Sequence, residues 1–101
     1  DAKECHSDTF ALQNIHEHQV TFMEKFEGQG GISFFLILFA KRNELYYLSY
    51  RQMRRFWDRA KAGGRKSFRY EELDPSFFLE NKKGILVPYL DGIAKDLELR
   101  D

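Results

Sequence analysis

The sequence predicts an α/β domain built around a central hairpin. The main observation is an almost unbroken apolar run, Ile32–Ala40, which is typical of an inner strand covered on both faces. A polar turn, Lys41–Asn43, joins it to a second strand, Glu44–Leu48, and Asn43 tolerates the positive φ that such a turn needs. Segments with helical periodicity precede and follow the hairpin, so the class is α/β.

The first five residues are predicted to form a strand. Their alternation would place Asp1, Lys3 and Cys5 on one face. A carboxylate and an ammonium two residues apart can share a site in which the acid binds a divalent cation and the lysine stabilises charge on a phosphate. An exposed acid and an exposed lysine near a terminus would give the same sequence pattern, so the pattern alone does not distinguish a metal site from a solvated pair.

A helix is expected over about Leu12–Glu27, after a loop at Ser7–Thr9 and before glycines at positions 28, 30 and 31. Gln19 falls in the middle of its apolar stripe. A primary amide facing a core costs about 1–3 kcal/mol unless it is hydrogen-bonded, so a polar partner is expected opposite it, at the start of the chain. The stripe consists of Leu12, Ile15, Phe22, Met23 and Phe26.

A second helix is predicted over Tyr50–Ala62, ended by glycines at positions 63 and 64. Ser49 is a suitable N-cap, and Gln52 would complete a capping box. The buried stripe is expected to contain Met53, Phe56, Trp57 and Ala60.

The C-terminal third is less regular. Asp74-Pro75 marks a turn, Gly84–Val87 is predicted as a short strand, and Tyr89–Leu99 as a last helix. That helix would turn Leu90, Ile93 and Leu97 inward.

Length and composition favour one domain over residues 1–101 with a single core. The sequence opens on Asp1 without a signal peptide, and no apolar run approaches the about 18 residues needed to span a bilayer, so a fragment of a soluble protein is expected. The single cysteine, Cys5, excludes an internal disulfide and fits a reducing cytoplasm.

Charge is balanced overall but uneven along the chain. The formal net charge is zero, which argues against a histone-like binder of nucleic acid. Between Arg51 and Arg69, however, there are eight Lys or Arg and one acid, Asp58. This segment is either a solvated helix face followed by an exposed loop, Arg65–Ser67, or a basic surface for a polyanion.

A zinc site is a weaker alternative. Cys5, His6, His16 and His18 supply enough ligand types, but adjacent residues and an i,i+2 pair on a helix suit a tetrahedral ion poorly. Cys5 is expected to be a small buried residue.

Six short strings, taken together, resemble the RecU-type Holliday junction resolvases, also called penicillin-binding-protein-related factor A. The similarity runs from Asp1 to about Ser67. The strings are Asp1-Ala2-Lys3, Ile15-His16-Glu17-His18-Gln19, Gly30-Gly31-Ile32, Asn43-Glu44-Leu45-Tyr46, Phe56-Trp57 and Gly63-Gly64-Arg65-Lys66-Ser67.

The resemblance implies a restriction-endonuclease-like mixed sheet flanked by helices, with an active site of the PD-(D/E)xK type. Asp1 and Lys3 match the (Asp/Glu)-x-Lys part, and Gln19 matches a glutamine that joins the Mg²⁺ site in this family. His16 and His18 would make second-shell or phosphate hydrogen bonds. The expected DNA contacts are Arg65, Lys66 and Ser67, with Arg54 and Arg59 after them.

The sequence departs from the family pattern in three ways. Asp1 stands where Glu is common, the stretch from Asp1 to Gln19 is one residue shorter, and the upstream strand with the first acidic ligand, like the stalk that enters the junction, is not in this sequence. We therefore expect an N-terminally incomplete nuclease domain.

The expected function is Mg²⁺-dependent, structure-selective cleavage of four-way DNA junctions in recombination and repair, with Mn²⁺ as a possible substitute. A cytoplasmic homodimer without membrane association is implied by the resemblance. One alternative is a non-catalytic DNA-binding module with the same fold. Another is a protein-interaction domain that uses an aromatic surface of Tyr46, Tyr47 and Trp57.

Overall fold

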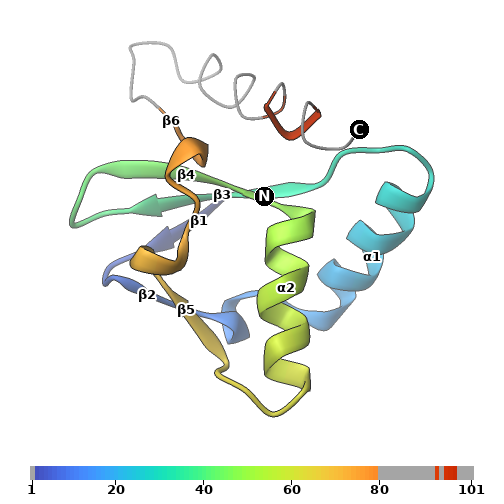
Figure 1. Cartoon of the computed structure of the whole chain (residues 1–101), viewed down its shortest axis with the longest axis horizontal. Coiled ribbons are helices and arrows are strands. Elements are labelled where there is room, and N and C mark those ends of the chain that lie inside the picture. Colours follow the sequence, from blue (N-terminus) through green and yellow to red (C-terminus); the bar gives the residue numbers. More distant parts are fainter. Residues whose placement is uncertain (1, 80–92, 94, 98–101) are drawn as a thin grey trace.

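A computed structural model describes residues 2–79, 93 and 95–97. A mixed four-stranded sheet of order β1-β3-β4-β6 is flanked by helices, as expected for the restriction-endonuclease-like fold, and β2 and β5 form a separate antiparallel pair (Figure 1). The elements are β1 Ala2–Cys5, β2 Thr9–Ala11, the 3-10 turn η1 Leu12–Asn14, α1 Glu17–Gly28, β3 Phe34–Phe39, β4 Glu44–Ser49, α2 Tyr50–Lys61, β5 Ser67–Arg69, η2 Tyr70–Glu72, η3 Pro75–Phe77 and β6 Phe78–Leu79.

Strand β3 is an inner strand, as predicted. It pairs in parallel with β1 and antiparallel with β4, and Asn43 in the hairpin turn has φ 50°. Burial is less symmetric than the apolar run suggested. Phe35, Ile37 and Phe39 are at most 2% exposed, whereas the alternate residues on the other face of β3 are only half-buried.

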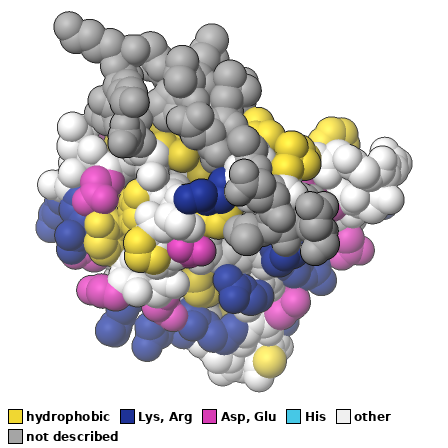
Figure 2. Space-filling view, turned by 45° about the horizontal axis from the view of Figure 1, so that its top comes forward, with side chains coloured by type: hydrophobic (Ala, Val, Ile, Leu, Met, Phe, Trp, Pro, Cys, Tyr) yellow, Lys and Arg dark blue, Asp and Glu magenta, His cyan; other side chains and the backbone are white. Residues whose placement is uncertain are grey.

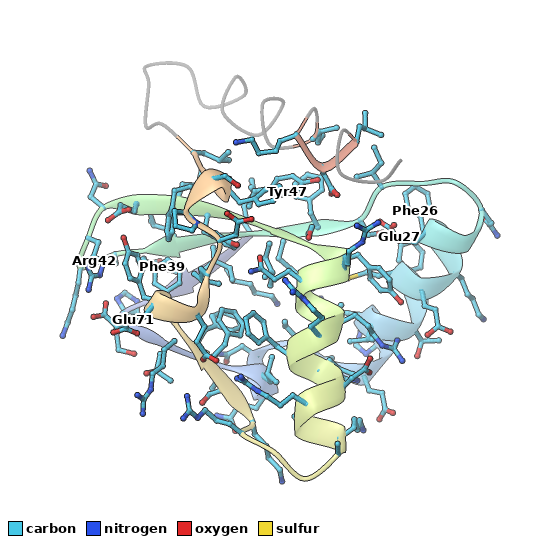
Figure 3. All side chains as sticks on the ribbon, viewed as in Figure 1. Phe26, Glu27, Phe39, Arg42, Tyr47 and Glu71 are labelled. Atoms are coloured by element: carbon cyan, nitrogen blue, oxygen red, sulfur yellow. The ribbon has the colours of Figure 1, made fainter. Side chains whose placement is uncertain are left out.

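The two faces of the sheet have different neighbours. Figure 1 shows α1, α2 and the β2–β5 pair on one side, and residues 93 and 95–97 on the other. Tyr47 and Phe39 point to opposite sides (Figure 3). The Tyr47 hydroxyl donates a hydrogen bond of 2.8 Å to the buried carboxylate of Asp96. Tyr46 and Tyr47 are both 0% exposed, so the prediction of an aromatic interaction surface was wrong.

The first helix starts later than predicted. Residues 12–14 form η1, Ile15 and His16 are extended, and α1 begins only at Glu17. This break changes the helical phase, so within α1 the predicted stripe is confirmed at Met23 and wrong at Phe22 and Phe26. Val20 and Met23 are its buried residues, and two predicted stripe residues are exposed, Phe22 by 67% and Phe26 by 42%.

Helix α2 agrees closely with its prediction. The Ser49 hydroxyl accepts a hydrogen bond of 3.3 Å from the Gln52 backbone N–H, which confirms the N-cap. The Gln52 side chain does not serve the predicted cap but turns into the core, where its oxygen accepts from the Tyr46 hydroxyl. Met53 and Phe56 are buried, and Trp57 and Ala60 are half-buried.

The β2–β5 pair was not predicted. Ser7–Thr9 and Arg65–Ser67 were both expected to be loops, but Thr9 begins β2 and Ser67 begins β5. Phe10 and Phe68 face each other across the pair with ring centroids 5.1 Å apart, and Phe68 stacks on Phe56 of α2 at 4.5 Å. This aromatic stack holds the pair against α2.

The C-terminal predictions lie partly outside the described residues. Gly84–Val87 and Leu90 lie outside the described residues. Residues 93 and 95–97 are helical, and Ile93 packs against the core, but Leu97 is 49% exposed and does not face inward as predicted. Within the described part of the chain, none of the helices has the length and apolar character to cross a bilayer.

Candidate active site

Strand β1 places Lys3 on the sheet face that α1 and α2 cover. Lys3 is paired with Ile37 and Cys5 with Phe39, and both partners belong to the buried face of β3. Lys3 and Cys5 therefore share a face, as predicted. Asp1, the predicted metal ligand, lies outside the described residues.

Phe35 is close to Lys3 and lines a hollow that Gln19 also lines. The Lys3 ammonium is 5.8 Å from the centroid of the Phe35 ring. Phe35 also lines a hollow of about 420 Å³, together with Gln19 and His18 at the start of α1. The fold thus brings Lys3 and Gln19, 16 positions apart in the sequence, to the surroundings of one aromatic ring.

Gln19 was predicted to face the core, but in the structure its side chain caps the start of α1. It is half-buried, and its side-chain oxygen accepts a hydrogen bond of 2.9 Å from the backbone N–H of His16, which caps α1. A carbonyl oxygen has two lone pairs, so accepting this hydrogen bond does not by itself prevent the Gln19 oxygen from binding a cation. The cap also fixes the orientation of the amide at the edge of the hollow.

His16 and His18 approach each other more closely than two helical residues at this spacing would. Their rings stack with centroids 5.5 Å apart and planes 6° apart, because His16 is the extended N-cap and only His18 is helical. Both are exposed. Among residues 2–79, 93 and 95–97, no three His, Cys, Asp or Glu side chains form a metal-binding group, so the structure gives no support to the zinc alternative.

Cys5 is buried, as expected. Its thiol donates to the carbonyl oxygens of Ser7, at 3.1 Å, and Thr9, at 3.3 Å. These bonds fold the chain from β1 into β2, which is a structural role.

The donor set that the sequence offers suits Mg²⁺. A carboxylate from Asp1 and the amide oxygen of Gln19 are hard oxygen ligands, and Mg²⁺ is commonly held by one or two carboxylates while it keeps several waters. The Lys3 ammonium has no lone pair and cannot be a ligand.

Two of the predicted DNA-binding arginines take part in internal ion pairs. Arg54 donates at 2.8 Å to Glu24 of α1 and at 3.0 Å to Asp58. Arg59 donates at 2.6 Å to Glu72 and at 2.8 Å to the Ser67 carbonyl. The hydrogen bond from Arg59 lowers the pKa of Glu72, which keeps this carboxylate ionised as a counter-ion.

The loop after α2 is more accessible. Lys66 is exposed and makes no ion pair with any other described residue, whereas Arg65 lies 3.6 Å from Glu72. Ser67, predicted as part of an exposed loop, is half-buried in β5. Figure 2 shows dark-blue basic side chains beside magenta acidic ones, so the visible face is not uniformly basic.

Two relevant partners were not predicted. Phe35 follows from the β1–β3 register, for which the local sequence holds no signal. Arg42, in the hairpin turn (Figure 3), donates two hydrogen bonds of 2.9 Å to Asp8, and its guanidinium lies 3.9 Å from the centroid of the Tyr70 ring. Its bidentate bond lowers the pKa of Asp8. Arg42 therefore anchors the turn to the segment before β2.

Comparison with known proteins places the chain in a family. A family model described as "Recombination protein U" (RecU) matches residues 1–95. The Holliday junction resolvase RecU of Pediococcus pentosaceus is 39% identical over 97% of this chain and 50% of its own length, and that of Levilactobacillus brevis is 38% identical over 92% and 47%. That of Oceanobacillus iheyensis is 43% identical over 70% of the chain and 37% of its own length. The chain thus spans about half the length of these relatives or less, and it belongs to the RecU family.

Proposed function

We propose that the chain takes part in Mg²⁺-dependent cleavage of four-way DNA junctions. Two observations support this activity: the relatives are named Holliday junction resolvases, and Lys3 lies near Phe35, which lines a hollow together with Gln19. The second observation carries the proposal because it concerns this chain's own residues and joins both motifs of the family.

Each residue has a distinct part in the proposed site. A bound Mg²⁺ activates water and offsets negative charge on the phosphate. Asp1 and Gln19 would hold the ion, and the cap bond from His16 keeps the Gln19 oxygen in place. Lys3 would stabilise the charge that develops on a non-bridging phosphate oxygen. His16 and His18, exposed beside Gln19, would donate hydrogen bonds to the neighbouring phosphates.

A four-way junction is resolved by two symmetric cuts, which require two active sites. We therefore propose a homodimer. An enzyme that acts on the chromosome is expected in the cytoplasm.

The test uses the chain at its relatives' length, as a chimera in which it replaces the matched segment of the Pediococcus pentosaceus protein. With Mg²⁺ or Mn²⁺, the chimera should cut a four-way junction faster than a linear duplex, and it should be inactive in EDTA. A folded chimera that binds junctions but cuts none with either ion would overturn the proposal and favour the non-catalytic module.

Replacing Gln19 should separate its two roles. We expect Gln19→Ala in the chimera to weaken Mn²⁺ binding by about 10- to 100-fold, the effect typical of a group that holds or orients a metal ligand. Loss of the cap should also cost about 1 kcal/mol of unfolding free energy. Gln19→Glu, which keeps an acceptor for the cap, is the matched control. If calorimetry shows an unchanged metal affinity for Gln19→Ala, Gln19 acts only as a helix cap and not as a metal ligand.

The basic loop should contribute to affinity without sequence preference. Each phosphate contact contributes about 0.9 to the slope of log affinity against log salt concentration. We expect Arg65→Ala with Lys66→Ala to reduce the slope by up to about 2, for junctions of any sequence. Arg54→Ala with Arg59→Ala is the comparison, and it should change the slope less because both side chains are internally paired. If Arg54→Ala with Arg59→Ala reduced the slope more than Arg65→Ala with Lys66→Ala, the DNA would have to pass over α2 instead.

A further inference from the structure

A second hollow lies at the start of α1 and is lined by different residues from the first. Its volume is about 440 Å³, and it is bounded by η1, the first turn of α1, the last turns of α2 and the loop after α2. Leu12 and Ile15, 4% and 2% exposed, form apolar walls. Trp57 presents a half-buried indole to the same space. We call this the Trp57 hollow.

Polar and charged groups lie at the rim of the Trp57 hollow. Gln13, Lys61 and Lys66 are exposed and line it, and Glu17 is the one acid among the lining residues. Glu17 approaches the Lys61 ammonium only to 3.7 Å, with side chains 76% and 60% exposed, so this pair contributes little and is easily exchanged. Two ammonium groups against one carboxylate leave a local charge of +1.

The backbone around the hollow is fixed. The Leu12 N–H donates a hydrogen bond of 3.0 Å to the Lys66 carbonyl, and Ala11 pairs with Ser67 in the β2–β5 ladder. These bonds hold η1 to the loop after α2 without any ligand. A preformed site of this kind loses little entropy on binding.

We propose that the Trp57 hollow binds an unpaired nucleotide of DNA, such as one unstacked at a branch point. The base would stack on the indole of Trp57, and the Gln13 amide would hydrogen-bond to its edge. The Lys61 ammonium, which lies 5.5 Å from the centroid of the Trp57 ring, would move to contact the phosphate beside Lys66. Aromatic faces beside cations are the usual platforms for single-stranded DNA. The proposal rests on the proposed function in that it takes DNA as the partner.

The size and charge of the hollow favour this ligand. Its volume lies in the range of about 300–1,000 Å³ that is usual for small-ligand sites, and the rim attracts an anion while the walls suit a flat apolar ring. A phosphate would replace Glu17 as the counter-ion of Lys61. Glu17 therefore opposes binding, and neutralising it should raise the affinity for the nucleotide.

Trp57 is the single tryptophan of the sequence, so its fluorescence reports on the hollow directly. The experiment titrates the 101-residue chain with a single-stranded oligothymidine and with a blunt duplex of equal length, in EDTA so that nothing is cleaved. The single strand should quench Trp57, and the duplex should not. Equal quenching by the single strand and the duplex would mean that the hollow contacts only phosphates, which overturns the nucleotide site. Binding of the single strand without quenching, or no binding at all, would also overturn it.

Three surface variants sharpen the test. Lys66→Gln should weaken binding of the single strand and lower its salt slope by about 0.7, the value for one phosphate contact on a single strand. Glu17→Gln should strengthen binding of the single strand. Lys41→Gln, in the exposed hairpin turn, is the matched control and should change neither the affinity nor the salt slope. Equal effects of Lys66→Gln and Lys41→Gln would indicate unspecific attraction and overturn the site.

Replacing the indole itself measures the stacking. Trp57→Ala should weaken single-strand binding by about 5- to 150-fold, detected by fluorescence anisotropy of a labelled oligonucleotide. Trp57 packs against the core, so a thermal unfolding curve accompanies this variant, and Gln13→Ala, which changes only an exposed amide, gives a second readout. Affinity unchanged in both folded variants would refute the assignment.

The result of the Trp57 quenching experiment is independent of junction cleavage by the chimera. If the chimera cuts junctions while Trp57 is not quenched, the nuclease proposal stands and the hollow has no nucleotide. If Trp57 is quenched and no junction is cut, the nucleotide site stands and the catalytic proposal fails.

Discussion

Lys3→Ala in the chimera should bind metal and junction DNA almost as well as the parent and cut about 10²- to 10³-fold more slowly. The reason is that an ammonium aimed at developing charge acts mainly in the transition state. The Lys3 ammonium lies on the sheet face beside Phe35, where nearby protein reduces its contact with water and strengthens its electrostatic effect. The measurement is a single-turnover cleavage rate with saturating enzyme, beside a binding isotherm without metal.

Lys25→Ala is the matched control, since Lys25 is an exposed lysine in the last turn of α1. It should cut at the parent rate. If Lys3→Ala instead loses DNA affinity and cleavage in equal proportion, Lys3 is a simple phosphate contact and its proposed role is wrong.

Phe68→Ala should lower the unfolding free energy by about 3–5 kcal/mol, the range for an aromatic core residue. Phe68 is 0% exposed and contacts both Phe10 and Phe56, so its loss leaves a cavity between the β2–β5 pair and α2. Urea unfolding followed by circular dichroism measures the change.

Phe22→Ala serves as the comparison because its ring is 67% exposed. We expect a change within about 0.5 kcal/mol for it, as for most surface positions. Similar losses for both variants would mean that the aromatic stack does not hold the β2–β5 pair.

The elements that were predicted correctly have local signals. The β3–β4 hairpin is specified by its apolar run and by Asn43 at the turn, and α2 by the Ser49 cap and the apolar spacing that follows it. Each of these signals lies within a few residues of the feature that it determines, so one sequence suffices to find it.

The elements that were missed depend on partners far along the chain. Strand β2 has three residues and is defined by pairing with β5, 58 positions later at the Phe10–Phe68 pair. No local pattern indicates that Ile15 and His16 are extended, so the helix was started too early and Phe22 and Phe26 were predicted to be buried.

The site was predictable only in part, for the same reason. The resemblance identified Lys3 and Gln19, but their common neighbour Phe35 follows from the parallel β1–β3 register and from the packing of α1. The internal pairing of Arg54 and Arg59 depends on Glu24 and Glu72, which lie outside the basic segment. Charge counted along a sequence does not show which cations are already neutralised.

The claim that Lys3 and Gln19 belong to one metal-dependent site is tested most directly by locating the ion. Crystals of the chimera soaked with Mn²⁺ would give its position from anomalous scattering. The account predicts an ion about 2.1 Å from the side-chain oxygen of Gln19, with the Asp1 carboxylate as a second ligand and the Lys3 ammonium on the same side of the sheet. An ion bound elsewhere, with Gln19 engaged only by the His16 N–H, would contradict it.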